Sequence, residues 1–233
     1  TKEDAAYLKD YIADKQPADL ERLCSILAVQ PIQPWHILAI TFTNKAANEL
    51  RSRLLQAIGE ECASMLHAST FHSACVRILR RSISKLGYDS NFTIYDTDDS
   101  QRLMKSCIAD ADVSEKQFPP RAVLTEISLA KDRMCSPEYF CIEAGSDYRK
   151  MVIGKLYKEY QNRLKSANAL DFDDLIYKTV ELLESFPEEL EYYQNRFRYI
   201  MVDEYQDTNL VQFKLVDLLA KKYRNICVVG DDD

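Results

Sequence analysis

Glycine is scarce in this sequence. Only 5 of the 233 residues are glycine, roughly 2% against a usual share of about 7%, and the first of them is Gly59. No Gly-x-x-x-x-Gly-Lys-Ser/Thr segment occurs, so these residues lack the loop in which backbone amides and a lysine hold nucleotide phosphates. The scarcity also excludes a glycine-rich dinucleotide fingerprint and a collagen-like repeat.

Long apolar runs and closely paired cysteines are also absent. No run approaches the ~20 apolar residues of a membrane-spanning helix, and the charged start Thr1-Lys2-Glu3-Asp4 lacks the apolar centre of a signal peptide. The seven cysteines form no Cys-x-x-Cys pair, which is typical of intracellular free thiols. With 46% hydrophobic and 29% charged residues, the composition predicts a globular protein. We therefore expect a cytoplasmic protein with no membrane partner.

Positive charge is outnumbered over the whole chain, whose formal net charge is −7. That balance alone argues against nucleic-acid binding, because nucleic-acid-binding proteins are commonly basic. Residues 41–90 depart from the average, since seven Lys and Arg residues outnumber four acidic residues there, a net of +3 (7 − 4). An acidic protein with one basic segment can still hold a phosphate backbone locally.

Hydrophobic periodicity predicts strand–helix units near both ends of the chain and helices between them. Short apolar runs predict strands at 36–42, 65–69, 199–203 and 225–230. Helical spacing predicts helices at 20–28, 44–58, 71–86, 148–164, 171–185 and 209–221, with Pro187 ending the fifth. The pattern predicts an α/β fold, with a parallel-sheet domain formed by residues 1–90 and 191–233 and a helical insertion of residues 91–190.

The most informative segment is VDEYQDTN, residues 202–209. An apolar strand is predicted to end in Asp203 and Glu204, before a polar turn and a helix. Ligands of parallel α/β sheets bind at the carboxyl ends of strands. An aspartate there can hold Mg²⁺, and a neighbouring glutamate can take a proton from a water that attacks a phosphate. The alternative is a solvated turn with Asp207 as a helix cap, but the full string in this context favours the chemical interpretation.

Two other segments lie where a predicted strand gives way to a helix. TFTNKAA, from Thr41, offers phosphate a helix N-terminus and Lys45, and offers a base the ring of Phe42. STFHS, residues 69–73, combines hydroxyls, an imidazole and backbone amides that suit phosphate or sugar contacts. A capped helix with Phe42 in the core, and a capped helix with a surface His72, are the structural alternatives.

The remaining two segments are acidic. In ALDFDDL, residues 169–175, acids at a helix start are explained by the helix dipole alone. In VVGDDD, residues 228–233, a strand that ends in glycine and acids suits a loop near a phosphate.

In their order along the chain, ILAITFTNKAANEL, STFHS, ALDFDDL, VDEYQDTN and VVGDDD resemble the motifs of the UvrD/Rep/PcrA-type superfamily 1 DNA helicases. The resemblance covers about residue 20 to the C-terminus and implies a first RecA-like domain interrupted by an all-helical subdomain. It implies ATP-driven 3′→5′ movement on single-stranded DNA with Mg²⁺, in replication or repair. The implied partners are single-stranded DNA, its junctions with duplex DNA, and repair or replication proteins in the bacterial nucleoid.

The resemblance also implies residue roles. Asp203 would coordinate Mg²⁺, Glu204 would activate the attacking water, and Gln206 would couple the nucleotide site to the DNA site. Gly230 and Asp231 would lie beside the nucleotide, and residues 171–175 near the DNA path. The implied contacts to single-stranded DNA are Phe42, Thr43, Asn44, Thr70, Phe71 and His72.

The sequence departs from the family pattern in one stretch. Residues 11–19 stand where the family has its Walker A loop, but contain no glycine and no Gly-Lys-Thr, and no adenine-contacting glutamine motif is recognisable before them. A second RecA-like domain with its arginine finger is also absent from these 233 residues. We therefore expect a helicase fragment that is inactive by itself. The alternative is a non-catalytic module that binds single-stranded DNA or a protein; the intact Asp203, Glu204 and Gln206 favour the fragment.

Overall fold

The computed structural model describes residues 1–13, 19–28 and 32–231, and its chain divides into two compact units, Thr1–Gln33 and Pro34–Asp233. The first unit contains α1 (Lys2–Ile12) and α2 (Leu20–Leu27), so the helix expected at 20–28 is confirmed. Tyr7 of α1 is buried, and its hydroxyl accepts a hydrogen bond from the backbone N–H of Asp19 at 3.1 Å. Residues 14–18, most of the stretch expected at the position of the Walker A loop, lie outside the described residues.

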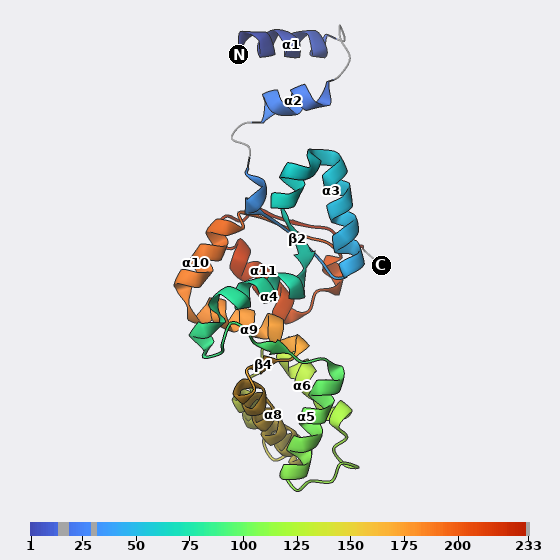
Figure 1. Ribbon diagram of the computed structural model, residues 1–233, viewed down its shortest axis with the longest axis vertical. Helices are drawn as coiled ribbons and strands as arrows, with labels where there is room; N and C mark the ends of the chain where they lie inside the picture. Colours follow the sequence, from blue (N-terminus) through green and yellow to red (C-terminus); the bar gives the residue numbers. More distant parts are fainter. Residues whose placement is uncertain (14–18, 29–31, 232–233) are drawn as a thin grey trace. The chain divides into compact units, whose positions relative to one another are not determined.

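A four-stranded parallel sheet organises the second unit (Figure 1). Its order is β2-β1-β5-β6, where β1 is Ile37–Thr41, β2 is His67–Thr70, β5 is Tyr199–Val202 and β6 is Ile226–Val228. Short apolar strands of this kind are typical of parallel sheets, and the four expected strands are confirmed. Because all four run the same way, their carboxyl ends meet at one edge of the sheet.

Helices from distant parts of the sequence cover the sheet. α3 (Asn44–Met65) packs on β1 and β2, whereas α4 (Phe71–Ser82), α9 (Phe172–Ser185) and α11 (Leu210–Ala220) gather below the sheet in the view of Figure 1. Residues of β1 and β5 pack with these three helices in one buried core. η2 (Ile83–Leu86) and α10 (Pro187–Arg196) contribute residues at the margin of that core. The strand residues in that core are Leu38, Ile40, Ile200 and Val202.

The insertion has a hydrophobic core of its own. It is formed by α5 (Thr97–Asp110), α6 (Pro120–Asp132), α7 (Pro137–Ala144) and α8 (Tyr148–Ser166). Two-residue strands β3 (Thr93–Ile94) and β4 (Ala169–Leu170) pair at its base, which the sequence did not indicate. α9 falls inside the expected insertion yet contributes Leu175, Val180 and Leu183 to the core below the sheet, and α10 crosses the expected boundary at residue 190. The division at residues 91 and 190 stays a prediction.

Glycine and proline set several helix ends. Gly87 caps η2 in a left-handed conformation, which glycine adopts without strain, and this confirms the expected stop. α3 runs past the expected end at residue 58 to Met65, with a break at Gly59, where φ is +79°. α9 ends at Ser185, two residues before Pro187, as expected. Pro187 also starts α10, which was not expected, because proline fits a first helical turn that needs no N–H donor. Among the described helices, none is both long and apolar enough to cross a membrane.

Candidate nucleotide and DNA site

The sheet gathers the expected site residues at the carboxyl ends of its strands. Phe42, Thr43 and Asn44 follow β1, Thr70 ends β2, Asp203 follows β5, and Gly230 lies just after β6. The register pairs Thr41 with Thr70, Ile40 with Val202, and Val202 with Val228, so the four ends are level. The expected DNA contacts occupy the β2–β1 half of this edge, and the expected nucleotide residues occupy the β5–β6 half.

The acidic turn after β5 is fixed by its backbone. The N–H of Asp203 donates to the carbonyl of Ile40 at 3.0 Å, and the carboxylate of Asp203 accepts from the N–H of Glu204 at 3.1 Å. Glu204 has φ +51° and ψ +45°, a left-handed conformation that costs a residue with a Cβ roughly 1–2 kcal/mol. Both side chains are exposed. The turn therefore holds two carboxylates toward solvent at the cost of local strain, a pattern common at functional sites.

Gln206 joins the acidic turn to the end of β6. The N–H of Tyr205 donates to the carbonyl of Val229 at 2.9 Å, and Oε1 of Gln206 accepts from the N–H of Asp231 at 3.3 Å. A Cβ at position 230 would lie 2.6 Å from that same Oε1, so a larger residue there would require the end of the Gln206 side chain to move. The structure thus brings Gln206, Gly230 and Asp231 together; Asp232 and Asp233 lie outside the described residues.

The acidic turn suits Mg²⁺ only as part of a shared site. Among the described residues, no group of three or more His, Cys, Asp or Glu side chains could enclose a metal ion. Mg²⁺ does not require such a cage, because it is commonly held by one or two carboxylates, several waters and substrate phosphates. Asp203, exposed at a strand end, fits that arrangement.

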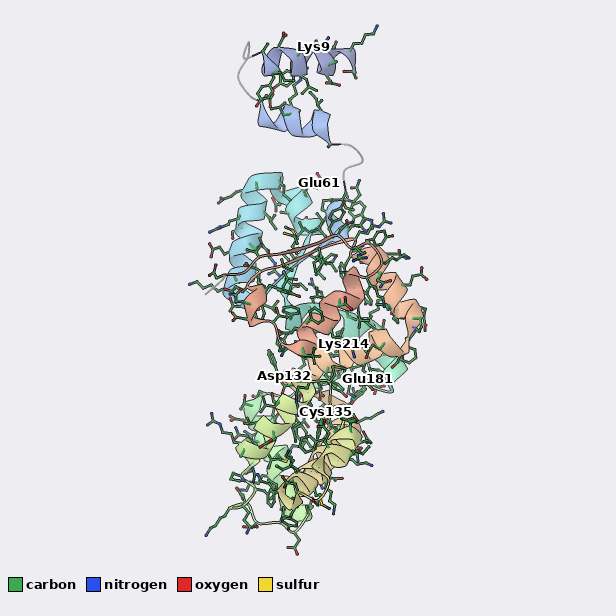
Figure 2. The ribbon with its side chains drawn as sticks, turned by 180° about the vertical axis from the view of Figure 1, so that it is seen from behind. Lys9, Glu61, Asp132, Cys135, Glu181 and Lys214 are labelled. Atoms are coloured by element: carbon green, nitrogen blue, oxygen red, sulfur yellow. The ribbon has the colours of Figure 1, made fainter. Side chains whose placement is uncertain are left out.

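A polar contact links the acidic segment to the insertion. Asn209 caps α11 in a capping box with Gln212, and its Nδ2 donates to Oδ1 of Asp132 at 2.7 Å. Asp132 is the last residue of α6, and Figure 2 shows it where the insertion meets the helices below the sheet. Sequence reasoning missed this contact, because nothing local indicates a partner 77 residues away.

The segments after β1 and β2 combine helix caps with aromatic packing. The hydroxyls of Thr43 and Thr70 accept the N–H groups of Ala46 and Ser73 at 3.1 and 3.3 Å, so both threonines cap helices, as the structural alternatives expected. Phe42 is only half-buried and packs edge-to-face on Phe71, with ring centroids 5.4 Å apart.

Burial separates the six expected DNA contacts into two groups. Thr43 and Asn44 are exposed, whereas Phe71 is 1% and Thr70 6% exposed. Phe71 and Thr70 can therefore position the surface, while Phe42, Thr43, Asn44 and His72 can reach a ligand.

His72 meets the ALDFDDL segment. Its imidazole stacks on the ring of Phe172, with centroids 3.8 Å apart and planes inclined by 24°. Burial lowers the pKa of His72 to about 4, so the imidazole is neutral at pH 7. Phe172 is 57% exposed and lines a groove with His72 and Ser73. The sequence placed Phe172 near the DNA path but gave no sign of this stacked pair.

A buried ion cluster fixes the start of α9. Nζ of Lys131 lies 2.6 Å from Asp171 and 2.9 Å from Asp174, and the hydroxyl of Tyr160 donates to Asp171 at 3.1 Å. Burial alone would lower the pKa of Lys131, but Asp171 and Asp174 raise it above its usual value. Burial and the charge of Asp171 raise the pKa of Asp174 to about 6. The helix dipole therefore explains these acids only in part, since both also pair with the buried ammonium group of Lys131.

Similarity to known proteins agrees with this arrangement. Residues 20–233 match the UvrD/REP helicase N-terminal domain. The chain is 48% identical over 212 residues to the ATP-dependent DNA helicase PcrA of Staphylococcus epidermidis, which covers 91% of this chain and 29% of that protein. It is 46% identical over 212 residues to the ATP-dependent DNA helicase PcrA of Bacillus subtilis strain 168, which covers 91% of this chain and 28% of that protein. The chain thus spans less than a third of the length of these curated relatives, and it belongs to the UvrD/REP helicase N-terminal domain family.

Proposed function

We propose that this chain forms the first motor domain of an ATP-dependent helicase that moves 3′→5′ on single-stranded DNA. The observation that carries the proposal is the common edge of the sheet: acids suited to nucleotide chemistry end β5, and aromatic and polar residues suited to DNA follow β1 and β2. The same edge of the sheet can therefore carry both a site for nucleotide hydrolysis and a site that binds DNA. The proposal places the protein in replication or repair at the bacterial nucleoid, on single strands and their junctions with duplex DNA.

The two acids have different roles in this proposal. Asp203 would hold Mg²⁺ together with phosphate oxygens and water, and Glu204 would accept a proton from the attacking water. Bound Mg²⁺ supplies positive charge beside the phosphates. Gln206 is held against Gly230 and Asp231. In this position it would couple the nucleotide site to the DNA site.

On the DNA side, different residues would bind the bases and the sugar-phosphate backbone. Phe42 and Phe172 would stack on bases, because exposed or half-exposed rings suit sequence-tolerant stacking. Neutral His72, stacked on Phe172, would act as a hydrogen-bonding group rather than as a cation. Thr43, Asn44 and the N-terminus of α3 would contact the backbone.

A non-catalytic module that binds single-stranded DNA is the second candidate. One observation favours it: all six expected DNA contacts lie among the described residues, whereas no glycine-rich phosphate loop occurs in the 233-residue sequence. Both candidates predict DNA binding, and only the first gives Asp203 and Glu204 a use.

Fluorescence anisotropy with a labelled oligothymidylate tests the DNA side of the proposal. We expect the chain to bind at low salt, with an affinity that falls steeply as salt rises. Phe42→Ala and Phe172→Ala should each weaken binding by about 1–3 kcal/mol, because each removes one stacked base. Tyr148→Ala is the matched control, since Tyr148 is an exposed aromatic residue in the insertion helix α8. No binding at low salt, or equal losses in all three variants, would contradict the proposal.

A further inference from the structure

Three arginines lie along the edge strand of the sheet. Nε of Arg51 donates to the carbonyl of Ala68 at 2.9 Å, and Nη2 of Arg77 donates to Oγ of Ser69 at 2.7 Å. Nη2 of Arg196 lies 3.1 Å from Nε2 of His67. The arginines come from α3, α4 and the end of α10, yet they contact three consecutive residues of β2. We call Arg51, Arg77 and Arg196 the arginine row.

No acid neutralises the arginine row. Within residues 1–13, 19–28 and 32–231, none of its three members forms an ion pair, whereas Arg53, Arg81 and Arg163 each pair with a glutamate. The contacts of the row are instead to a carbonyl, a hydroxyl and an imidazole, and to the side-chain amide of Asn48. The row therefore concentrates positive charge on a protein whose net charge is −7.

The positive charge of the row lowers the pKa values of groups within and beside it. Burial, together with the charges of Arg77 and Arg196, lowers the pKa of His67 to about 4, so His67 adds no positive charge at pH 7. Burial and the charge of Arg51 hold the pKa of Arg77 below its usual value. An anion beside the row would relieve the repulsion, and planar guanidinium groups match the oxygens of a phosphate.

The row begins at the proposed DNA surface. Arg51 and Arg77 line the same groove as His72, Ser73 and Phe172. Arg77 also lines a second hollow, with Arg196 and His67. Because Arg77 lines both hollows, the row connects the groove beside the strand ends with a hollow at His67, the first residue of β2.

We propose that the arginine row binds backbone phosphates of single-stranded DNA beyond the bases held at the strand ends. The inference rests on the proposed function, which supplies single-stranded DNA as the ligand. The three arginines themselves lie outside the sequence motifs that resemble the helicase family. It extends the DNA path from the carboxyl ends of the sheet along its β2 edge.

The salt dependence of binding tests the row. We expect Arg51→Gln, Arg77→Gln and Arg196→Gln each to weaken binding of an oligothymidylate several-fold at low salt. Each should also reduce the slope of log K against log salt by ~0.7, the value for one phosphate contact on a single strand. Arg102→Gln is the matched control, because it removes the same charge from an exposed side chain on α5 in the insertion. Thermal melting followed by circular dichroism verifies that each variant is folded, and Arg51 is exposed, so at least that variant should fold normally.

A charge-retaining variant separates DNA binding from a structural role. Arg77→Lys should keep the wild-type slope if the positive charge binds phosphate, and should behave like Arg77→Gln if only the contact with Ser69 matters. The inference is overturned if the glutamine variants keep the slope of Arg102→Gln, or if Arg77→Lys loses it. If the wild-type chain binds and Phe42→Ala weakens it, that failure leaves the proposed function intact. If the wild-type chain does not bind DNA, the proposed function fails first.

Discussion

At the scale of single residues, Glu204 shows a conflict between stability and chemistry. Its backbone is left-handed in a turn where glycine would be unstrained, yet the position carries a carboxylate. The neighbouring hydrogen bonds, from Asp203 to Ile40 and from Tyr205 to Val229, fix the turn on both sides. The fold therefore imposes the conformation, and the carboxylate is explained by the site rather than by packing.

This conflict yields a stability prediction. Glu204→Gly should raise the free energy of unfolding by ~0.5–1 kcal/mol, because relief of the left-handed strain exceeds the extra freedom that glycine gives the unfolded chain. Urea unfolding measures the change, and Glu204→Gln, which keeps the Cβ, is the control and should leave stability within ~0.5 kcal/mol of wild type. A loss of stability in Glu204→Gly would show that the side chain of Glu204 stabilises the turn.

At the scale of elements, local patterns predicted the strands and most of the helices. The apolar runs became the parallel strands β1, which is buried, and β5, which alternates exposed and buried residues, and polar residues after them cap helices, so both can be inferred from neighbours in sequence. β3 and β4 could not be inferred, because two residues are too few to show periodicity. The start of α10 was missed because proline is compatible with both the end and the beginning of a helix.

In the candidate site, too, some features were predictable from local sequence and others depended on the tertiary fold. The strand-end positions of Asp203 and Phe42 were predictable from local pattern. The stacking of His72 on Phe172, and the contact of Asn209 with Asp132, depend on segments that only the tertiary fold brings together.

The junction between the insertion and α9 provides the prediction at this scale. Lys131→Met should lower the free energy of unfolding by about 3–5 kcal/mol, because it leaves Asp171 and Asp174 buried without their cation. The loss should be smaller at pH 5 than at pH 8, since carboxylates without a cation have raised pKa values and can be neutralised by protons.

Chemical denaturation at the two pH values measures this loss. Lys105→Met on α5 is the control, because its ammonium group is exposed and lies 3.4 Å from Glu115 in a surface pair, which should contribute at most ~1 kcal/mol. A loss below ~1 kcal/mol for Lys131→Met would mean that the cluster does not stabilise the junction.

At the scale of the whole molecule, the DNA half and the nucleotide half of the sheet edge formed by the carboxyl ends of the strands differ in which expected groups are present. The DNA half has its aromatic rings, its caps and the arginine row within the described residues. The nucleotide half has Asp203, Glu204 and Gln206, but the sequence contains no glycine-rich loop whose amides and lysine would hold the phosphates. DNA binding by these 233 residues should therefore not depend on nucleotide.

This asymmetry gives the prediction for the chain as a whole. Millimolar ATP with Mg²⁺ should leave the affinity for single-stranded DNA unchanged within about twofold, once ionic strength is matched, and DNA should stimulate no measurable ATP hydrolysis. Anisotropy titrations with and without nucleotide, together with a coupled ATPase assay, measure both quantities. Glu204→Gln distinguishes intrinsic turnover from a contaminating ATPase, because only intrinsic turnover should vanish in that variant. DNA-stimulated hydrolysis that Glu204→Gln abolishes would show that these residues can hold a nucleotide without the loop, and the expectation of an inactive chain would then be wrong.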